Sequence, residues 1–333
     1  MRSCVSVFKD ESKLDINYVP PRLPYREQQL NLLNQFFRFV LEAPGRMTQR
    51  VLIAGKIGTG KTVLTQHFGQ TITRETQNRG INLHYVHVNC RECKGSLFTI
   101  LQRIVMKFSP NFPRRGYSAY ELLQAVMQIL NEQKAYLILT LDELEALIHN
   151  EGSDALYNLT RIQEDYMLAA QRLSLIGVVR EAASLEALDA STRSTMQRNV
   201  IRLEDYSQPQ LCDILNDRIP YAFHENTVPE QTLDLTAESA AAEGGDARYA
   251  IELLWRAGKY ADAEGARQVL PEHVRKASAS VYPSVSKDTV LSLSLHEKLF
   301  LLAIARRFRV SGAACMSMGE AENAYAVVCE EYG

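Results

Sequence analysis

The chain has 333 residues, 46% of them hydrophobic, and a formal net charge of −2 from 37 basic and 39 acidic side chains. This composition excludes a disordered chain and a uniformly basic nucleic-acid coat, although a local basic surface is compatible with it. The sequence contains no run of about 18 apolar residues and no N-terminal signal-peptide core. We therefore expect no membrane partner and a cytoplasmic location.

The six cysteines are scattered along the chain, and only Cys90 and Cys93 form a Cys-x-x-Cys pair. A disulfide framework is not expected at this length in a reducing compartment. We interpret the pair as structural thiols, and metal binding or redox chemistry is the open alternative.

The predicted elements alternate along the first two thirds of the chain. Residues 1–25 are polar and then rich in proline, which predicts an extended arm. Helical periodicity predicts helices over residues 26–42, about 60–78, 96–107, 118–133 and 153–170. Apolar runs predict strands over residues 51–55, 83–89, 136–141, 173–179 and the short stretch 199–203. Strands separated by helices imply right-handed crossovers, so the fold class is α/β with a doubly wound parallel sheet.

The strand signals stop after Tyr206. Residues 208–280 have the pattern of a small α-helical domain, 283–289 that of a linker, and 294–307 and 319–331 that of two more helices. We therefore expect three parts, with boundaries at 1–204, 205–282 and 283–333.

Residues 55–62 carry a phosphate-binding signature. Gly55-Lys-Ile-Gly-Thr-Gly-Lys-Thr62 fits G-x-x-x-x-G-K-[ST] and lies between an apolar strand and a helix, the context that the motif requires. Glycines allow the backbone to wrap around phosphate oxygens, and the following helix adds its positive end. The predicted nucleotide-binding residues here are Gly58, Thr59, Gly60, Lys61, Thr62 and Val63, with Lys61 at the β- and γ-phosphates and Thr62 at Mg²⁺.

A second signature ends the predicted strand 136–141, which runs into Asp142 and Glu143. Desolvated carboxylates at the end of a buried strand need a partner or a metal. We interpret the pair as a Walker B site in which Asp142 orients Mg²⁺ and Glu143 polarises the attacking water. The alternative is an ordinary cap and first-turn pair for the next helix.

Several segments together resemble one family. They are the arm Tyr18–Glu27, Val88-Asn89-Cys90, Leu141-Asp142-Glu143, the run Gly245-Asp-Ala-Arg-Tyr-Ala250 with Leu253-Leu254, and Ala261-Asp-Ala-Glu264. They are similar to the archaeal members of the origin-recognition-complex subunit one / cell-division-cycle-six family, AAA+ initiators of DNA replication. The resemblance runs over nearly the whole chain, and its most specific parts are the arm and the run around Arg248.

The resemblance implies a nucleotide-binding base domain, a helical lid and a C-terminal winged helix that binds origin DNA, with ATP or ADP and Mg²⁺ as cofactors. It places the adenine among Val19, Pro20, Leu23 and Arg26, with Tyr206 and Ile214 on the other side. Arg248 would reach the γ-phosphate from the lid, and a surface salt bridge is the alternative for it. The implied partners are origin duplex DNA and a replicative helicase or other initiator subunits, which implies a nucleoid-associated protein.

Two departures concern hydrolysis. Arg180 follows the predicted fourth strand, where the family usually has a polar sensor 1 residue, often Asn. Arginine cannot accept a hydrogen bond from water, so we expect slow hydrolysis. The family's arginine-finger position falls on Ser191; Arg193 or Arg198 is the candidate substitute, and an ordinary surface role is equally open.

The third departure concerns the C-terminus. The last two predicted helices resemble the start of a winged helix, and the sequence ends at Gly333. We therefore expect a partial winged helix with exposed apolar residues such as Leu299, Phe300 and Leu302 and poor or swapped packing.

Two basic clusters are candidates for DNA contacts. Arg114 and Arg115 lie where the resembling family carries an initiator-specific insertion, and a solvated turn is the alternative. Arg306 and Arg307 end the first helix of the tail, where they suit either a phosphate or the helix end itself.

The favoured function is an ATP-binding origin binder that helps recruit the replicative helicase and is switched by slow hydrolysis. One alternative is a non-hydrolysing regulator that keeps nucleotide as a structural ligand. The other is an AAA+ ATPase of another clade, such as a transposition helper or a clamp-loader-like protein.

Overall fold

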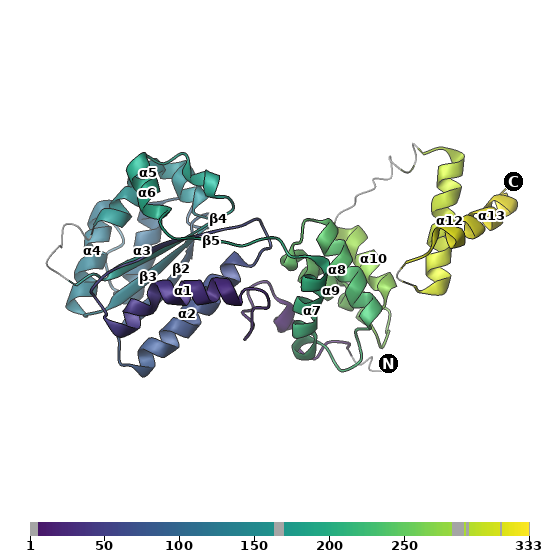
Figure 1. The fold of residues 1–333 in the computed structure, drawn as a ribbon, viewed down its shortest axis with the longest axis horizontal. Helices are drawn as coiled ribbons and strands as arrows, with labels where there is room; N and C mark the ends of the chain where they lie inside the picture. Colours follow the sequence, from purple (N-terminus) through teal and green to yellow (C-terminus); the bar gives the residue numbers. More distant parts are fainter. Residues whose placement is uncertain (1–5, 163–169, 282–289, 291–292, 314, 333) are drawn as a thin grey trace. The chain divides into compact units, whose positions relative to one another are not determined.

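The computed structural model describes residues 6–162, 170–281, 290, 293–313 and 315–332. These residues form two compact units (Figure 1). One unit is Pro21–Asp205, and the other combines the described residues up to Pro20 with those from Tyr206 onward.

The first unit is built on a five-stranded sheet of order β2-β3-β4-β1-β5, in which every neighbouring pair is parallel. The strands are β1 (Arg50–Ala54), β2 (Leu83–Asn89), β3 (Tyr136–Asp142), β4 (Leu173–Val179) and β5 (Val200–Arg202). The predicted doubly wound parallel sheet is confirmed. Its carboxyl edge carries the ends of β1 and β3, where the two predicted signatures begin.

Helices cover both faces of the sheet because successive strand residues point to opposite sides. Val51 and Ile53 pack in one core with α1 (Glu27–Glu42) and α2 (Lys61–Asn78). Leu52 and Leu139 pack in the other core. That core also contains residues of α3 (Leu97–Phe108), α4 (Ala119–Glu132), α5 (Glu145–Arg161) and α6 (Ala190–Met196), and the 3₁₀ turn η3 (Ala182–Leu185) lies beside them.

The helix predicted over 153–170 corresponds to the second of two helical pieces in α5. α5 spans Glu145–Arg161, and its two pieces meet at a kink at Gly152, whose φ of 67° and ψ of −149° are not helical. A glycine adopts this left-handed φ without a Cβ clash, so the chain can turn sharply between the two pieces. Residues 163–169 lie outside the described residues.

The second unit contains α7 (Gln208–Ala222), α8 (Glu230–Ala242), α9 (Ala247–Ala263) and α10 (Pro271–Val281), as the helical pattern predicted. The chain before Pro20 packs on them: Phe8 and Phe223 stack with centroids 4.9 Å apart, and the Val7 amide donates to Asp262 at 2.7 Å. This arm includes the short 3₁₀ helix η1 (Glu11–Leu14). Residues 6–20 therefore group with the helical unit, whereas the expected boundary assigned them to 1–204.

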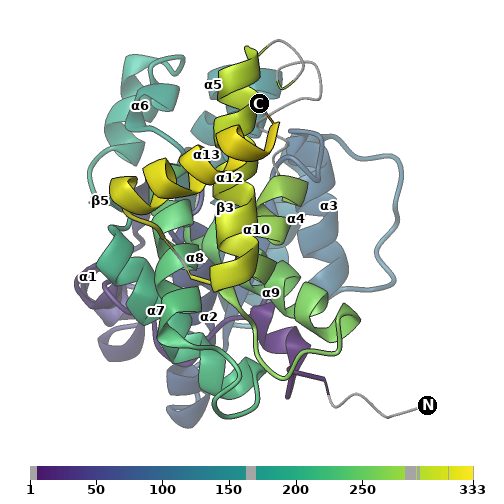
Figure 2. The ribbon, with the colours of Figure 1, turned by 90° about the vertical axis from the view of Figure 1, so that its right-hand side faces the viewer.

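The last two described helices are α12 (Leu295–Ser311) and α13 (Met318–Tyr332), which pack against each other (Figure 2). Leu299 is only 8% exposed in their small core, and Phe300 meets Tyr325 edge to face at 5.5 Å. The expectation that Leu299, Phe300 and Leu302 are exposed is wrong, because contacts between α12 and α13 bury Leu299 and half-bury the other two. Leu301 and Val327 are exposed instead. The predicted linker 283–289 lies outside the described residues.

Candidate functional site: a phosphate loop beside a buried carboxylate

The loop between β1 and α2 has the backbone conformation of an anion cradle. Gly58 and Gly60 have φ values of 76° and 89°, and Gly60 caps the 18-residue helix α2. A turn that alternates in this way directs backbone N–H groups inward, and the helix end adds partial positive charge. The geometry at this edge of the sheet therefore suits a phosphate group.

The loop is closely fitted to the surrounding backbone. A Cβ on Gly55 would meet the Leu203 carbonyl oxygen at 2.6 Å, so no larger residue fits there. The Thr59 side chain is fully buried, and its hydroxyl donates to the Lys56 carbonyl at 2.9 Å. These contacts fix the loop shape in the protein itself.

Lys61, the first residue of α2, turns back over the loop. Its ammonium donates to the carbonyl of Gly55 and, at 2.5 Å, to that of Lys56. Lys56 is exposed, and its ammonium forms an ion pair with Asp205 at 2.5 Å. The two lysines of the motif thus have different surroundings, and the Lys61 charge is the one held at the cradle.

Arg26 is hydrogen-bonded to the backbone of the phosphate loop. Only 5% of this residue is exposed, and its guanidinium donates to the Thr59 carbonyl at 3.1 Å and to the Glu204 carbonyl at 2.6 Å. One side chain thereby joins the loop, the start of α1 and the segment after β5. The family resemblance implies that Arg26 lies near the adenine, and in the structure its guanidinium donates to backbone carbonyls.

Asp142 ends β3 and is 4% exposed. Its Oδ2 accepts a hydrogen bond from the Thr62 hydroxyl at 2.7 Å and lies 3.3 Å from His87 Nε2, and its Oδ1 accepts from the Glu143 amide at 2.9 Å. Burial raises the pKa of Asp142, but the hydrogen bonds from His87 and Thr62 lower it by more, so the net pKa lies below its usual value. The carboxylate stays ionised at neutral pH.

Glu143 has a left-handed φ of 49°. This conformation costs a non-glycine residue about 1–2 kcal/mol and recurs at functional sites. Its carbonyl accepts the Ala146 amide at 3.0 Å, which begins the turn into α5. The strained residue therefore sits directly beside the buried carboxylate.

The donors at this point fit magnesium. A threonine hydroxyl and a carboxylate lie 2.7 Å apart beside an anion cradle, and Mg²⁺ favours one or two carboxylates together with phosphate oxygens. Groups of three or more His, Cys, Asp or Glu side chains that could enclose a metal are absent from the residues that the structure describes.

Arg180 follows β4 at the same edge of the sheet. Its carbonyl accepts the Gly55 amide at 3.1 Å, its own amide donates to the Glu145 carboxylate, and its side chain is exposed. The backbone of Arg180 is therefore fixed between the phosphate loop and the first residue of α5, while its guanidinium lies at the surface.

The residues predicted for the adenine are divided between the two units. Leu23 and Arg26 belong to the first unit, and Val19, Pro20, Tyr206 and Ile214 belong to the helical unit. Tyr206 and Ile214 are 7% and 8% exposed and form part of the helical core.

The other two candidate arginines lie near helix ends, Arg248 in the first turn of α9 and Arg193 in the last turn of α6. Arg248 is exposed at the start of α9, where Asp246 caps the helix by accepting the Arg248 amide at 2.7 Å. Arg193 is half-buried in α6, and the neighbouring Ser191 hydroxyl accepts from Arg161 at 2.8 Å.

The two basic clusters differ in their contacts. Arg114 and Arg115 are exposed in the α3–α4 loop, which the Phe112–Tyr117 ring pair holds with centroids 5.0 Å apart. Arg306 instead forms an ion pair with Glu331 and donates to the Tyr332 hydroxyl at 3.1 Å. Arg307 pairs with Glu320 at 3.2 Å.

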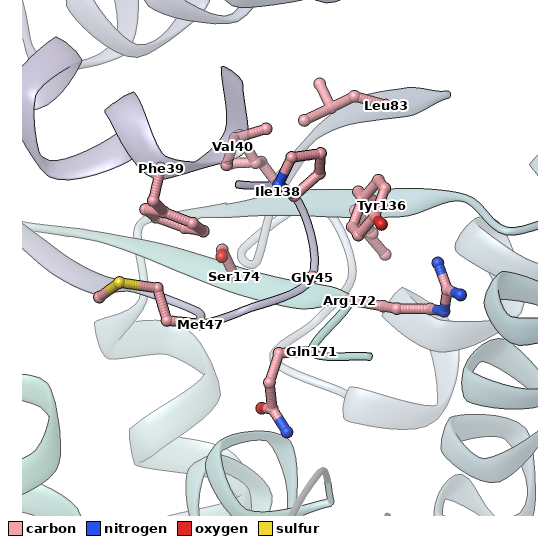
Figure 3. A pocket seen from close by; sticks show the side chains of 12 residues that line it. Phe39, Val40, Gly45, Met47, Leu83, Tyr136, Ile138, Gln171, Arg172 and Ser174 are labelled. Atoms are coloured by element: carbon pink, nitrogen blue, oxygen red, sulfur yellow. The ribbon is translucent and has the colours of Figure 1, made fainter. Parts of the chain in front are cut away.

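The first unit also contains a cysteine pair and a small cavity. Cys90 and Cys93 are both buried in the core, and burial raises the pKa of the Cys90 thiol, so the pair has the character of structural thiols. A small cavity of about 10 Å³ lies at the amino ends of the strands, lined by Leu83, Tyr136 and Ser174 among others (Figure 3). It is far too small for a nucleotide.

Sequence reasoning missed one residue of the site. His87 lies on β2 and contacts Asp142, although no spacing motif marks it. The alternation of β2 puts His87 on the same face as Asn89, but only the assembled sheet shows that Asn89 pairs in register with Asp142.

A phosphate loop after β1 and a buried carboxylate at the end of β3 are the features of a class, the P-loop nucleotide-binding proteins. The sequence matches the family profiles described as "AAA ATPase domain" over residues 22–176, "Cdc6 AAA+ ATPase-type lid domain" over 212–279 and "CDC6, C terminal winged helix domain" over 288–333. In the described residues, no helix is both long enough and apolar enough to span a membrane.

Relatives and solved structures agree with these matches. The chain is 34% identical to the ORC1-type DNA replication protein 2 of Sulfurisphaera tokodaii, over 98% of this chain and 80% of the relative. The Cdc6p structure from Pyrobaculum aerophilum has a TM-score of 0.86 at 35% identity, covering 98% of this chain and 86% of that one. The structure of the Aeropyrum pernix ORC1 protein in complex with DNA has a TM-score of 0.76 at 28% identity, covering 100% and 84%.

The chain belongs to the ORC1-type/Cdc6 family of DNA replication proteins. The predicted resemblance and fold class, an AAA+ domain with a helical lid and a C-terminal winged helix, are confirmed. This membership rules against an AAA+ ATPase of another clade.

Proposed function

We propose that the chain is a nucleotide-switched replication initiator that binds origin duplex DNA, helps recruit the replicative helicase and hydrolyses ATP slowly. The observation that carries the proposal is the 2.7 Å hydrogen bond from Thr62, at the end of the phosphate loop, to the buried Asp142 carboxylate. It brings the phosphate loop and a buried carboxylate together in a chain of the initiator family.

The nucleotide phosphates would bind at the loop formed by Gly58, Thr59, Gly60, Lys61, Thr62 and Val63. The loop amides and the start of α2 supply fixed donors, and Lys61 exchanges its loop carbonyl partners for the β- and γ-phosphates. Val19, Pro20, Leu23, Arg26, Tyr206 and Ile214 are the proposed surroundings of the adenine. This arrangement is compatible with both ATP and ADP.

Thr62 and Asp142 would hold Mg²⁺, which when bound offsets the negative charge of the phosphates. Glu143 would accept a proton from the attacking water and hold it in place. Arg248, from the lid, and Arg193, from α6, are the proposed cationic partners of the γ-phosphate charge. Lys61, Asp142, Glu143, Arg248 and Arg193 are thus the proposed catalytic set.

Slow hydrolysis follows from Arg180. A guanidinium stabilises phosphate charge but cannot accept a hydrogen bond from water, so it cannot replace an asparagine carbonyl. The test is a single-turnover measurement with ATP already bound. We expect Arg180→Asn to hydrolyse faster than the wild type and Glu143→Gln to be inactive.

Arg180 also favours a second candidate, a regulator that keeps its nucleotide bound without hydrolysing it. In that case the wild type would hydrolyse ATP no faster than Glu143→Gln. Tight, magnesium-dependent nucleotide binding is common to both candidates, so its absence would contradict both.

Duplex DNA is the proposed partner of Arg114 and Arg115, with Arg306 and Arg307 as secondary contacts. Support comes from the Aeropyrum pernix ORC1 protein, whose structure was solved in complex with DNA. The proposed location is accordingly on DNA in the cytoplasm, at the nucleoid. Co-sedimentation with the purified replicative helicase on duplex DNA tests the recruitment step, and no increase of bound helicase would contradict it.

A further inference from the structure

Two sets of polar contacts join α2 to β2 and β3. In the first, the Tyr85 hydroxyl donates to the Thr65 carbonyl at 2.7 Å and accepts from the Thr140 hydroxyl at 2.9 Å. In the second, Thr62 and His87 both contact Oδ2 of Asp142, at 2.7 Å and 3.3 Å.

The second set repeats the first, displaced toward the phosphate loop. Thr62 precedes Thr65 by three residues, about one helical turn, while His87 and Asp142 follow Tyr85 and Thr140 by two residues on their strands. These displacements put His87 and Asp142 on the same strand faces as Tyr85 and Thr140, and Thr62 about one turn before Thr65; Thr65 uses its backbone carbonyl and Thr62 its hydroxyl. The fold therefore places His87 beside the Walker B carboxylate by the same geometry that places Tyr85 beside Thr140.

The contacts also identify the atom of His87 that faces Asp142, which is Nε2. An ionised carboxylate only accepts hydrogen bonds, so a hydrogen bond across this 3.3 Å contact requires the hydrogen on Nε2 of His87. Its other ring nitrogen, Nδ1, is buried and has no hydrogen-bond partner among the described residues. Among the described residues, the polar contact of the His87 ring is therefore the one between Nε2 and Asp142.

We propose that His87 is a positioning residue that holds the Asp142 carboxylate in register with the end of the phosphate loop. Thr62 reaches Oδ2 from α2, His87 reaches it from β2, and the Glu143 amide holds Oδ1. Donors from two different elements oppose rotation of the carboxylate. The His87 contact does not use the Thr62 hydroxyl, so it remains in place when that hydroxyl engages magnesium. The inference rests on the proposed nucleotide and magnesium binding.

The test is the magnesium dependence of nucleotide binding. A fluorescent ADP analogue is titrated into the full chain in EDTA and then at increasing Mg²⁺ concentration, for the wild type and for His87→Ala, His87→Gln and Tyr85→Phe. Outer-shell partners of metal ligands typically contribute about 10-fold or more to metal affinity. We expect His87→Ala to raise the Mg²⁺ midpoint about 10-fold and to leave binding in EDTA unchanged.

The two other variants separate positioning from packing. His87→Gln keeps a donor at nearly the reach of Nε2, so we expect it to recover most of the lost magnesium affinity. Tyr85→Phe removes the matching contact one step farther from the site. It should lower the melting temperature and leave the Mg²⁺ midpoint unchanged. If His87→Ala does not fold, His87→Asn, whose amide is too short, replaces it.

Three results would overturn the inference. The first is a His87→Ala midpoint equal to that of a wild type that does respond to Mg²⁺; the proposed function would then still stand. The second is an equal midpoint shift in His87→Ala, His87→Gln and Tyr85→Phe, which indicates a general packing effect. The third is a wild type whose nucleotide binding ignores Mg²⁺, which removes the proposed function and this inference together.

Discussion

The carboxyl edge of the sheet and the C-terminal helix pair both contain arginines, lysines and carboxylates, yet they use them differently. At the sheet edge, Asp142 and Arg26 are buried and are held by neutral or backbone partners. On α12 and α13, Arg306 and Arg307 are exposed and pair with glutamates of the same helix pair. Buried, fixed charges can act on a ligand, whereas exposed charges that neutralise one another offer little net field.

The largest expected effect is at Lys61. Lys61→Ala removes the charge that the cradle holds for the phosphates, and two charge-assisted hydrogen bonds correspond to about 100-fold in affinity. Isothermal titration with ADP measures the loss. Lys56→Ala is the matched control, because Lys56 is exposed and paired with Asp205. Equal ADP affinities of the two variants would contradict the prediction that Lys61, and not Lys56, binds the phosphates.

The second prediction concerns the contribution of the Arg26 hydrogen bonds to the stability of the protein. Arg26→Ala leaves the Thr59 and Glu204 carbonyls without this donor, and we expect a loss of about 2 kcal/mol in the free energy of unfolding. Urea unfolding measures it, with the exposed Arg22→Ala as the control. A loss no larger than that of Arg22→Ala would show that these hydrogen bonds add no stability.

Asp142 gives the pH dependence of the buried site. Its pKa is depressed in the folded state, so its stabilising contribution is present above the unfolded pKa of about 3.9 and is lost as the pH falls through the lower folded value. The difference in unfolding free energy between wild type and Asp142→Asn should therefore shrink below about pH 4. A difference that stays constant down to pH 2 would contradict the depressed pKa.

The next expected effect concerns DNA. Replacing both Arg114 and Arg115 with alanine should reduce the slope of log affinity against log salt by about two, because two phosphate contacts are lost. Replacing both Arg306 and Arg307 should change it less, because each is already ion-paired. Anisotropy titrations over a series of salt concentrations measure both slopes, and the opposite order would reverse the assignment of the two clusters.

The smallest expected effect comes from releasing the paired arginines. Glu320→Gln together with Glu331→Gln removes the partners of Arg307 and Arg306 and should steepen the same salt slope slightly. The melting temperature should change little, since exposed ion pairs contribute little to stability. A clear loss of duplex affinity in this variant would mean that the glutamates, rather than the arginines, serve binding.

Much of the fold was predictable because its signals are local. The runs that became β1, β3 and β4 are largely apolar, as is typical of strands buried on both faces, and the loop after β1 matches a motif whose spacing is fixed. The helical piece that follows Gly152 was predicted with its start at residue 153, whereas the shorter piece that begins at Glu145 was not predicted. A short helical piece shows too few turns for a clear periodicity.

The unpredicted parts depend on partners distant in sequence. Phe8 is buried by Phe223, Leu299 is covered by α13, and His87 faces Asp142 only because β2 and β3 pair in a particular register. Roles for Lys61, Thr62 and Asp142 could be proposed from the sequence because each residue belongs to a motif. A lone histidine on a strand carries no such spacing, so its place beside the carboxylate emerges only from the assembled sheet.

The most direct test of the account is an anisotropy titration of a labelled candidate-origin duplex and a scrambled duplex at fixed salt, each with ATP and with ADP. The account predicts tighter binding to the origin duplex and a difference between the two nucleotides. Equal, steeply salt-dependent binding to both duplexes, unaffected by the nucleotide, would contradict a nucleotide-switched origin binder.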